Sequence, residues 1–348
     1  MKVVVLGAGA SAYFDTRRPS WERPPTGEAL LLRGKAMGLL DDPFFAELSE
    51  AAVMYAATRP APSGSEFSVD IEDLLVWVAD QFEADSASRL GGTIPRKAFD
   101  PQLVLGEATY FLYELLRAPI AAFRSRGDAY TRLAQSFHKQ QFAVISLNYD
   151  TLFELAANNC KLGISYTQPV PPGSVPVIKL HGSVNWMNPL SRAVRFGGSG
   201  PFDPKMAMRL IYSNSFQMEP VQFLPPDDPV AYSWRDLLSD GENYFEVALI
   251  PPVGSMKNFQ KMAVYQRMVD WSRTLLGSSD ELVFIGTSLR AQDQVLRDLL
   301  RPALRRRPKI TIAGGVNKAK AALVEIEPKA DLASAQLFGT FEEYADIL

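Results

Sequence analysis

The amino-terminal stretch KVVVLGAGASA constrains the fold more than any other part of the chain. Residues 2–6 form a short, mostly β-branched run that ends abruptly in Gly7, Ala8 and Gly9. Such a run is typical of a buried parallel strand that enters a tight turn. In the G-x-G-x-x-G/A motif, the amides of this turn hold a pyrophosphate at a helix N-terminus. We therefore expect an α/β fold whose first turn either binds a nucleotide or is a tight strand-to-helix turn without a ligand.

The region after this turn favours nucleotide binding over hydride transfer. Dehydrogenases with this motif place an acidic residue about 20 positions further on, where it holds the adenosine ribose. Here the corresponding region reads RRPSWERPPTG, which is too rich in proline and charge for a regular element. We expect it to be a long functional loop that ends near Gly27.

Later apolar runs predict further strands of a parallel sheet. They are FAVISLNYD at 142–150, VPVIKLHG at 175–182, YFEVALIPP at 244–252, ELVFIGTS at 281–288 and KITIAGG at 309–315. Helical stretches separate some of these runs, as in an α/β sheet covered on both faces. Residues 1–27 and 141–348 are therefore expected to form a Rossmann-like core. Residues 28–140 show helical spacing and predict a helical insertion subdomain, and 187–243 predict an irregular insertion near the active site.

Composition excludes several classes of protein. The 348 residues include 47% hydrophobic and 22% charged residues, which is typical of a soluble globular chain. A formal net charge of −3 provides no basic field for nucleic acid, and no apolar run approaches the roughly 18 residues of a membrane span. The single cysteine, Cys160, allows neither an internal disulfide nor a four-ligand zinc site of Cys and His. We expect a cytoplasmic protein without zinc.

Polar residues follow two of the predicted strands at the edge where ligands bind in open α/β sheets. Asn148 and Asp150 follow the first, and such a pair can fix a carboxamide, orient a water or cap the next helix. His181, one of two histidines, follows the second. An imidazole there suits general-base work or a hydrogen bond to a ribose hydroxyl, although a lone histidine is more often structural. The other histidine, His138, has no such setting.

The run FIGTSLRAQD adds three residues at the end of another strand. Gly286 permits a close approach of the backbone, and Thr287 and Ser288 can donate to phosphate or ribose oxygens or cap a helix. The basic segment RPALRRRPK at 301–309 is expected to be a solvated helix end, with an assembly surface as the alternative.

Taken in order, these pieces resemble the sirtuin superfamily, and its bacterial SIR2-like branch more closely than the protein deacylases. The matching pieces are GAGAS, LNYD, KLHGS, LIPP followed by a helix with a tryptophan, FIGTSL and FGTFEEYADIL. The resemblance covers almost the whole chain. It implies a SIR2-like domain over 1–348, in which a Rossmann-like part binds NAD+ as the substrate and the helical insertion forms the other wall of the cleft.

The resemblance also implies roles for individual residues. Asn148 would orient a water beside the nicotinamide ribose, Asp150 would hold the carboxamide, and His181 would contact the ribose hydroxyls. The residues implied for cofactor binding are Gly7, Ala8, Gly9 and Ser11 at the pyrophosphate and Gly286, Thr287 and Ser288 on the other side. Gly315 and Asn317 are candidates for the adenosine end.

Departures from the family pattern bear on the reaction. Deacylases of the superfamily carry a four-cysteine zinc module between the histidine and the GTS strand, and this interval contains no cysteine here. The PDFR-like sequence that they carry after the GAG turn is replaced by PPTGEAL. Water is therefore the expected acceptor, which predicts an NAD+ glycohydrolase that works without a metal. An NAD-dependent deacylase or ADP-ribosyltransferase, and a catalytically idle module that senses NAD+ or ADP-ribose, are the alternatives.

The resemblance further implies a biological setting. Enzymes of this branch commonly serve in bacterial anti-phage defence, where they deplete NAD+ in abortive infection when triggered. Such an effector is controlled by self-assembly into a homo-oligomer or by a partner such as a HerA-like ATPase or an Argonaute-type sensor. The helical insertion is, like the basic segment, a candidate assembly surface.

Overall fold

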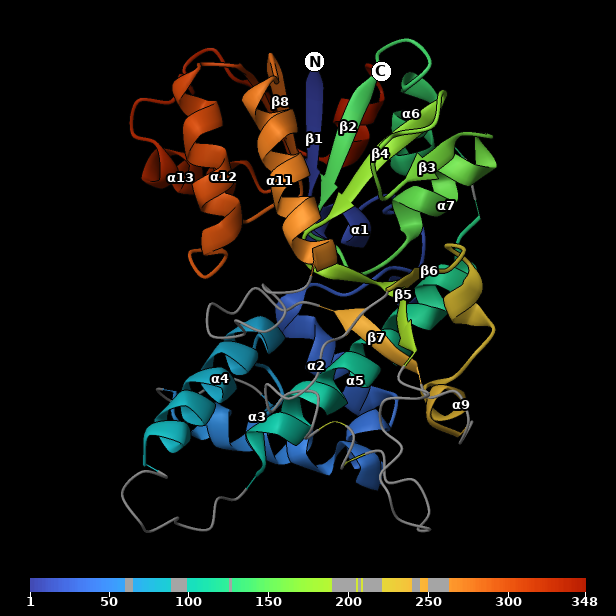
Figure 1. Cartoon of the computed structure of the whole chain (residues 1–348), viewed down its shortest axis with the longest axis vertical. Helices are drawn as coiled ribbons and strands as arrows, with labels where there is room; N and C mark the ends of the chain where they lie inside the picture. The colour runs from blue at the N-terminus through green and yellow to red at the C-terminus, as the bar shows by residue number, and fades with distance from the viewer. Residues whose placement is uncertain are drawn as a thin grey trace.

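A seven-stranded parallel sheet lies at the centre of the upper part of the molecule, with a group of helices below it (Figure 1). The structure is a computed structural model, and it describes residues 1–59, 65–88, 99–124, 127–189, 205, 208, 221–239, 245–249 and 263–348. The predicted fold class, α/β with a Rossmann-like parallel sheet, is confirmed.

The sheet has the strand order β10-β9-β8-β1-β2-β4-β3. Its strands are β1 Lys2–Leu6, β2 Phe142–Ser146, β3 Gly163–Ser165, β4 Ser174–Lys179, β8 Glu281–Ile285, β9 Lys309–Ala313 and β10 Gln336–Phe338. The central strands are buried on both faces, which explains their unbroken apolar runs. Leu6 pairs with Ser146 on one side and with Ile285 on the other. The turns after β1, β2 and β8 therefore emerge at one level of one edge.

The order of the strands also locates a crevice. From β1 the chain builds outward through β2, β4 and β3 on one side and through β8, β9 and β10 on the other. In an open sheet of this kind, the point where the order reverses leaves a ligand crevice outside the carboxyl ends of the strands. Here that point lies at β1, next to β2 and β8.

Two layers of helices cover the sheet. One contains α11 Ala263–Gly277, α12 Gln294–Arg305 and α13 Val316–Ile326, which contact one another in sequence. The other contains α6 Ala129–Ser136, α7 Leu152–Asn159 and α14 Phe341–Ala345, with the short α1 Ala8–Ala12 at the start of the chain. Although α6 falls within the range expected for the helical insertion, it packs against α7 and α14. None of the described helices is long and apolar enough to cross a membrane.

The lower group of helices is organised around α5 Pro101–Ala122. It contacts α2 Gly27–Ala36, α3 Ala46–Ala57 and α4 Ile71–Ser88. Short 3₁₀ turns η1 Ser20–Glu22, η2 Leu39–Asp41 and η3 Pro43–Phe45 lie between the first helices. Asp100 caps α5 by accepting from the Gln102 amide, with proline at the first helical position. A Cβ atom on Gly34 of α2 would lie 2.2 Å from the Phe111 ring, so α2 and α5 approach closely because this residue is glycine.

The prediction that the run at 244–252 joins the parallel sheet is wrong. β7 Phe245–Leu249 pairs antiparallel with β5 Gly182–Pro189, and β6 Gln222–Phe223 pairs with the other edge of β5. An apolar run indicates a buried strand but not the sheet that buries it. Of the irregular insertion predicted at 187–243, the described parts are the end of β5, β6, η5 Asp228–Val230 and α9 Trp234–Ser239. Residues 190–204, 206–207, 209–220, 240–244 and 250–252 lie outside the described residues.

Candidate functional site

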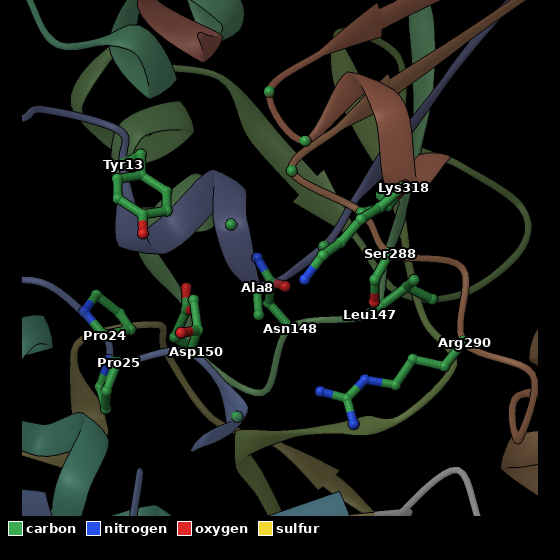
Figure 2. A pocket seen from close by; sticks show the side chains of 18 of the residues that line it. Ala8, Tyr13, Pro24, Pro25, Leu147, Asn148, Asp150, Ser288, Arg290 and Lys318 are labelled. Atoms are coloured by element: carbon green, nitrogen blue, oxygen red, sulfur yellow. The ribbon is translucent and has the colours of Figure 1, made fainter. Parts of the chain in front are cut away.

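A cavity of about 610 Å³ lies between the carboxyl edge of the sheet and the group of helices around α5 (Figure 2). Its volume falls within the roughly 300–1,000 Å³ that is usual for sites of small molecules. Most of the predicted site residues line it: Gly7, Ala8, Gly9, Asn148, Asp150, His181, Gly286, Thr287, Ser288 and Gly315. Ser11 and Asn317 are not among the lining residues. Residues from five separate segments of the chain therefore meet in one place.

The glycines of the first turn pack directly against the turn after β8. The Gly9 amide donates to the Gly286 carbonyl at 2.9 Å. A Cβ atom on Gly7 would lie 2.6 Å from that same carbonyl oxygen. One on Gly286, whose φ is 58°, would lie 2.1 Å from the amide nitrogen of Ala10. Both turns therefore need glycine for their own contact, before any ligand is considered.

Asn148 is fixed by a buried network of hydroxyl groups. Its Nδ2 donates to the Ser11 Oγ at 2.9 Å and lies 3.3 Å from the Tyr130 hydroxyl. Ser11 and Tyr130 are themselves 2.8 Å apart and fully buried. Burial raises the pKa of Tyr130 well above its ordinary value, so its hydroxyl keeps its proton. Ser11, predicted to hold a pyrophosphate, positions the amide of Asn148 and is not among the residues that line the cavity.

The oxygen of the same carboxamide, Oδ1 of Asn148, is buried and has no hydrogen-bond partner among the described residues. Because Ser11 and Tyr130 fix the nitrogen, they also fix the direction of this oxygen. Figure 2 shows the carboxamide at the centre of the cavity, between Asp150 and Lys318 in this view. The site therefore presents an oriented acceptor for a water or a hydroxyl group.

Asp150 combines the two roles that the sequence left open. One carboxylate oxygen accepts from the Leu152 amide at 3.0 Å at the start of α7, and the residue also lines the cavity. Its backbone carbonyl accepts from the Nζ of Lys179, which is fully buried and paired with Glu154 at 3.0 Å. A charge in the middle of the apolar run VIKL was the signal for this buried pair, which holds the Asp150 turn on β4.

His181 has a protein partner at each ring nitrogen. Nδ1 lies 3.2 Å from the Leu147 carbonyl and Nε2 lies 2.9 Å from a carboxylate oxygen of Asp293. Burial alone would lower the pKa of His181, but Asp293 and, more weakly, Glu72 and the Leu147 carbonyl outweigh burial, so the pKa is raised. Both partners are acceptors, so both bonds form only when each nitrogen carries a proton. In this arrangement the ring is a hydrogen-bond donor rather than a free base.

The sequence patterns did not identify Asp293, although it is the last residue of the run FIGTSLRAQD. Its second oxygen accepts from the Leu296 amide at 3.1 Å, which makes it the N-cap of α12. Thr287 and Ser288 therefore do not cap that helix. The Oγ1 of Thr287 is buried and makes no hydrogen bond with any described residue, while Ser288 is exposed to the cavity.

The segment between β8 and α12 is also tied to the opposite wall. The Arg290 guanidinium forms a two-pronged bond with Asp70 at 2.7 and 2.5 Å, and its Nε lies 3.0 Å from Glu72. Burial would raise the pKa of Asp70, but these bonds hold it below its ordinary value. Asp70 also caps α4 by accepting from the Glu72 amide at 2.9 Å. Its cap position in VDIEDLL was the only local signal.

The charged residues of the cavity are unevenly placed. The lining carboxylates belong to the starts of α2 and α4, the turn after β2 and the N-cap of α12: Glu28, Asp70, Glu72, Asp150 and Asp293. The described lining residues that follow β9 and β10 include no carboxylate and one cation, Lys318. Arg290 and His181 pair with Asp70, Glu72 and Asp293. The carboxylates of the lining therefore gather toward α4 and the turn after β2, while the lining cation without a described partner, Lys318, lies beside α13.

We compared the chain with known proteins by sequence and by structure. No protein-family model matches the chain, and no curated protein matches it. Solved structures do. Sir2Tm bound to a propionylated peptide has a TM-score of 0.43 at 15% identity, and a complex titled Sir2-p53 peptide-NAD+ has 0.42 at 15%. Sir2 with the inhibitor EX-527, 2′-O-acetyl-ADP-ribose and deacetylated p53 peptide has 0.40 at 14%. Each match covers 100% of this chain and 91% of the other, and the likeness concerns the fold alone.

Proposed function

We propose that the chain is an NAD+ glycohydrolase, which cleaves NAD+ to nicotinamide and ADP-ribose with water as the acceptor. The observation that carries the proposal is the Asn148 carboxamide, whose nitrogen is fixed while its buried oxygen accepts from no group in the described part of the chain. A buried polar atom left unpaired costs about 1–3 kcal/mol. A water that donates to Oδ1 removes this penalty and is held in one place, which is the positioning that a hydrolytic attack requires.

The distribution of charge supports the same reaction. NAD+ carries a positive nicotinamide ring, and its cleavage builds positive charge on the ribosyl carbon. Fixed negative groups stabilise such a centre most effectively in a cavity that excludes water. Asp150 lies two residues from Asn148, and Asp293 is joined through His181 to the Leu147 carbonyl. Because the charge of Asp293 is offset by the protonated ring of His181, we assign the charge of the ribosyl carbon to Asp150, for which the described residues provide no cationic partner.

Each of these residues then has a role that its bonds allow. One oxygen of Asp150 bonds Leu152, and the other accepts from the carboxamide of nicotinamide. His181 exchanges its Nδ1 bond to the Leu147 carbonyl for a bond to a ribose hydroxyl, while Asp293 keeps its hydrogen bond to Nε2. A general-base role would require His181 to lose the proton that Asp293 stabilises. The mechanism does not need it, because the glycosidic bond breaks ahead of the attack by water.

The resemblance to SIR2-like proteins supports the biological part of the proposal. We place the enzyme in the cytoplasm of a bacterium, as the NAD+-depleting effector of an anti-phage system. Assembly into a homo-oligomer, or binding of a HerA-like ATPase or an Argonaute-type sensor, would switch it on. Neither zinc nor another metal has a part in this mechanism.

The decisive experiment measures nicotinamide release from NAD+ by the purified protein, with and without these partners. Asn148→Ala and His181→Ala should each lower turnover by about 100-fold or more, because the water and the ribose lose their positions. His138→Ala is the matched control, since this second histidine is exposed and far from the cavity lining. Release that persists in both site variants while they remain folded would show that the assigned mechanism is wrong.

Two further measurements separate the alternatives. Faster nicotinamide release on addition of an acyl-lysine peptide would indicate a deacylase, whereas the glycohydrolase is unaffected. Tight binding of ADP-ribose without any turnover, even in an assembled complex, would indicate a sensing module.

A further inference from the structure

Lys318 is a cation of the cavity lining that has no partner among the residues described by the structure. It lies in the first turn of α13, after Gly314 and Gly315, whose φ angles are 71° and 63°. Figure 2 shows its side chain reaching from α13 toward Ala8 and Asn148. It forms no hydrogen bond or ion pair with any residue that the structure describes, whereas Arg290 and His181 are bonded to carboxylates. This cation is therefore available to a ligand.

Three features around Lys318 favour an anionic ligand. The N-cap of the 11-residue α13 is Gly315, which provides no side-chain cap, so the first amides of the helix remain open. The Oγ1 of Thr287 in the neighbouring lining segment is buried and has no hydrogen-bond partner within the described ranges. The described lining residues after β9 and β10 carry no carboxylate that would compete for the ammonium group.

We propose that Lys318 binds the diphosphate of the dinucleotide, on the side of the cavity opposite the carboxylates of α4. The inference rests on the proposed function for the identity of the ligand, and it names the group that this residue recognises. A lysine ammonium is a compact point charge that suits phosphate oxygens. The site then prefers ligands with a bridging diphosphate, such as NAD+, ADP-ribose and ADP, over nucleoside monophosphates. The part of the cavity beside α13 then holds the diphosphate, while the part with the carboxylates receives the cationic nicotinamide ring.

The test compares Lys318→Gln with Lys320→Gln in the full-length protein. Both lysines belong to α13, but Lys320 does not line the cavity. By calorimetry, Lys318→Gln should weaken ADP-ribose and ADP about tenfold, a typical effect of losing one charge-assisted bond, and AMP by clearly less. Lys320→Gln should leave all three affinities unchanged. In turnover, Lys318→Gln should raise KM for NAD+ with kcat nearly unchanged, since the lysine holds the ligand equally before and during cleavage.

Three results would overturn the assignment. Equal ADP-ribose affinities in the two variants and the wild type would show that Lys318 does not hold the ligand. A loss of the same size for AMP as for ADP would show that it does not read the diphosphate. A loss confined to NADP+ would place it at the ribose 2′-phosphate. Binding that depends on Lys318 in a protein that never releases nicotinamide would refute the proposed function and leave this inference standing.

Discussion

The two walls of the cavity hold their polar residues in different ways. At the sheet edge, Asn148 is oriented by the uncharged hydroxyls of Ser11 and Tyr130, both fully buried. Across the cavity, Arg290 is held by Asp70 and Glu72, whose side chains are 9% and 20% exposed. A neutral network is insensitive to salt and to pH near neutrality, whereas partly exposed ion pairs respond to both. We therefore expect the contacts of Asn148 to be insensitive to salt and pH, and the contacts of Arg290 with Asp70 and Glu72 to weaken when either is changed.

The largest expected effect comes from removing the cation of the second wall. Arg290→Ala removes the cation that pairs with Asp70 and Glu72 and leaves Asp70 bonded only to backbone amides, so it should lower the free energy of unfolding by about 2–3 kcal/mol. Chemical denaturation measures this value. The matched control is Arg273→Ala, because Arg273 also pairs with an aspartate, Asp270, but on an exposed helix face. If Arg290→Ala is no more destabilising than Arg273→Ala, the Arg290 contacts do not hold the two walls together.

Ser11→Ala tests the first wall. The change removes one acceptor of the Asn148 amide, so the carboxamide can rotate and the water of the proposed mechanism is no longer held in one position. We expect turnover to fall about tenfold, as a small misplacement in a site does, while ADP-ribose binds as before. A variant that loses ADP-ribose affinity and keeps its kcat would instead return Ser11 to the pyrophosphate role predicted from the GAGASA motif.

Glu107 shows that the helical part also carries a titrating carboxylate in its interior. It is fully buried in α5, accepts from the Leu48 amide and pairs with Lys205, and burial raises its pKa to about 7. The folded state therefore binds a proton more tightly than the unfolded chain. Stability should fall as pH rises from about 4.5 to 7, by up to about 1.4 kcal/mol per pH unit.

Thermal unfolding at a series of pH values measures this slope. Glu107→Gln should flatten the profile over the same range. A slope that is unchanged in this variant would assign the titration to another group.

The smallest effect concerns the proton on His181. Asp293→Asn removes the carboxylate that outweighs burial, so the pKa of His181 should fall. The chain has two histidines, so an NMR titration shows two imidazole signals and exposed His138 serves as the internal reference. In the wild type, the raised pKa stabilises the fold below about pH 6.5, and this contribution disappears as pH rises through the raised value. An unmoved His181 signal in Asp293→Asn would show that Asp293 does not control the ring.

Local patterns found the parts of the molecule that local physics determines. The runs at 142–150 and 281–288 were recognised because strands buried on both faces need unbroken apolar sequence, and Asn148 and Gly286 because strand ends meet at one edge. The run at 244–252 looked the same yet pairs antiparallel with β5 in the smaller sheet. Which sheet buries a strand depends on pairings that the sequence does not display locally.

The partners of the site residues were out of reach for a related reason. Tyr130 is separated from Ser11 by 119 residues, Asp293 from His181 by 112, and Arg290 from Asp70 by 220. Each of these residues has an ordinary local explanation in its own segment, such as a helix cap for Asp70 and Asp293. Only the fold brings them together, so the sequence predicted several of the strand-end residues that line the cavity but not the partners that hold them there.

The two carboxylate oxygens of Asp293 connect the cavity to the start of α12. One oxygen bonds the Leu296 amide and the other bonds His181. A ligand that displaces His181 weakens the hydrogen bond between His181 and Asp293. Because the same carboxylate caps α12, the first turn of that helix should become less stable. Deuterium uptake at the Leu296 amide should therefore track whether the cavity is filled, without any label on the ligand and without any turnover.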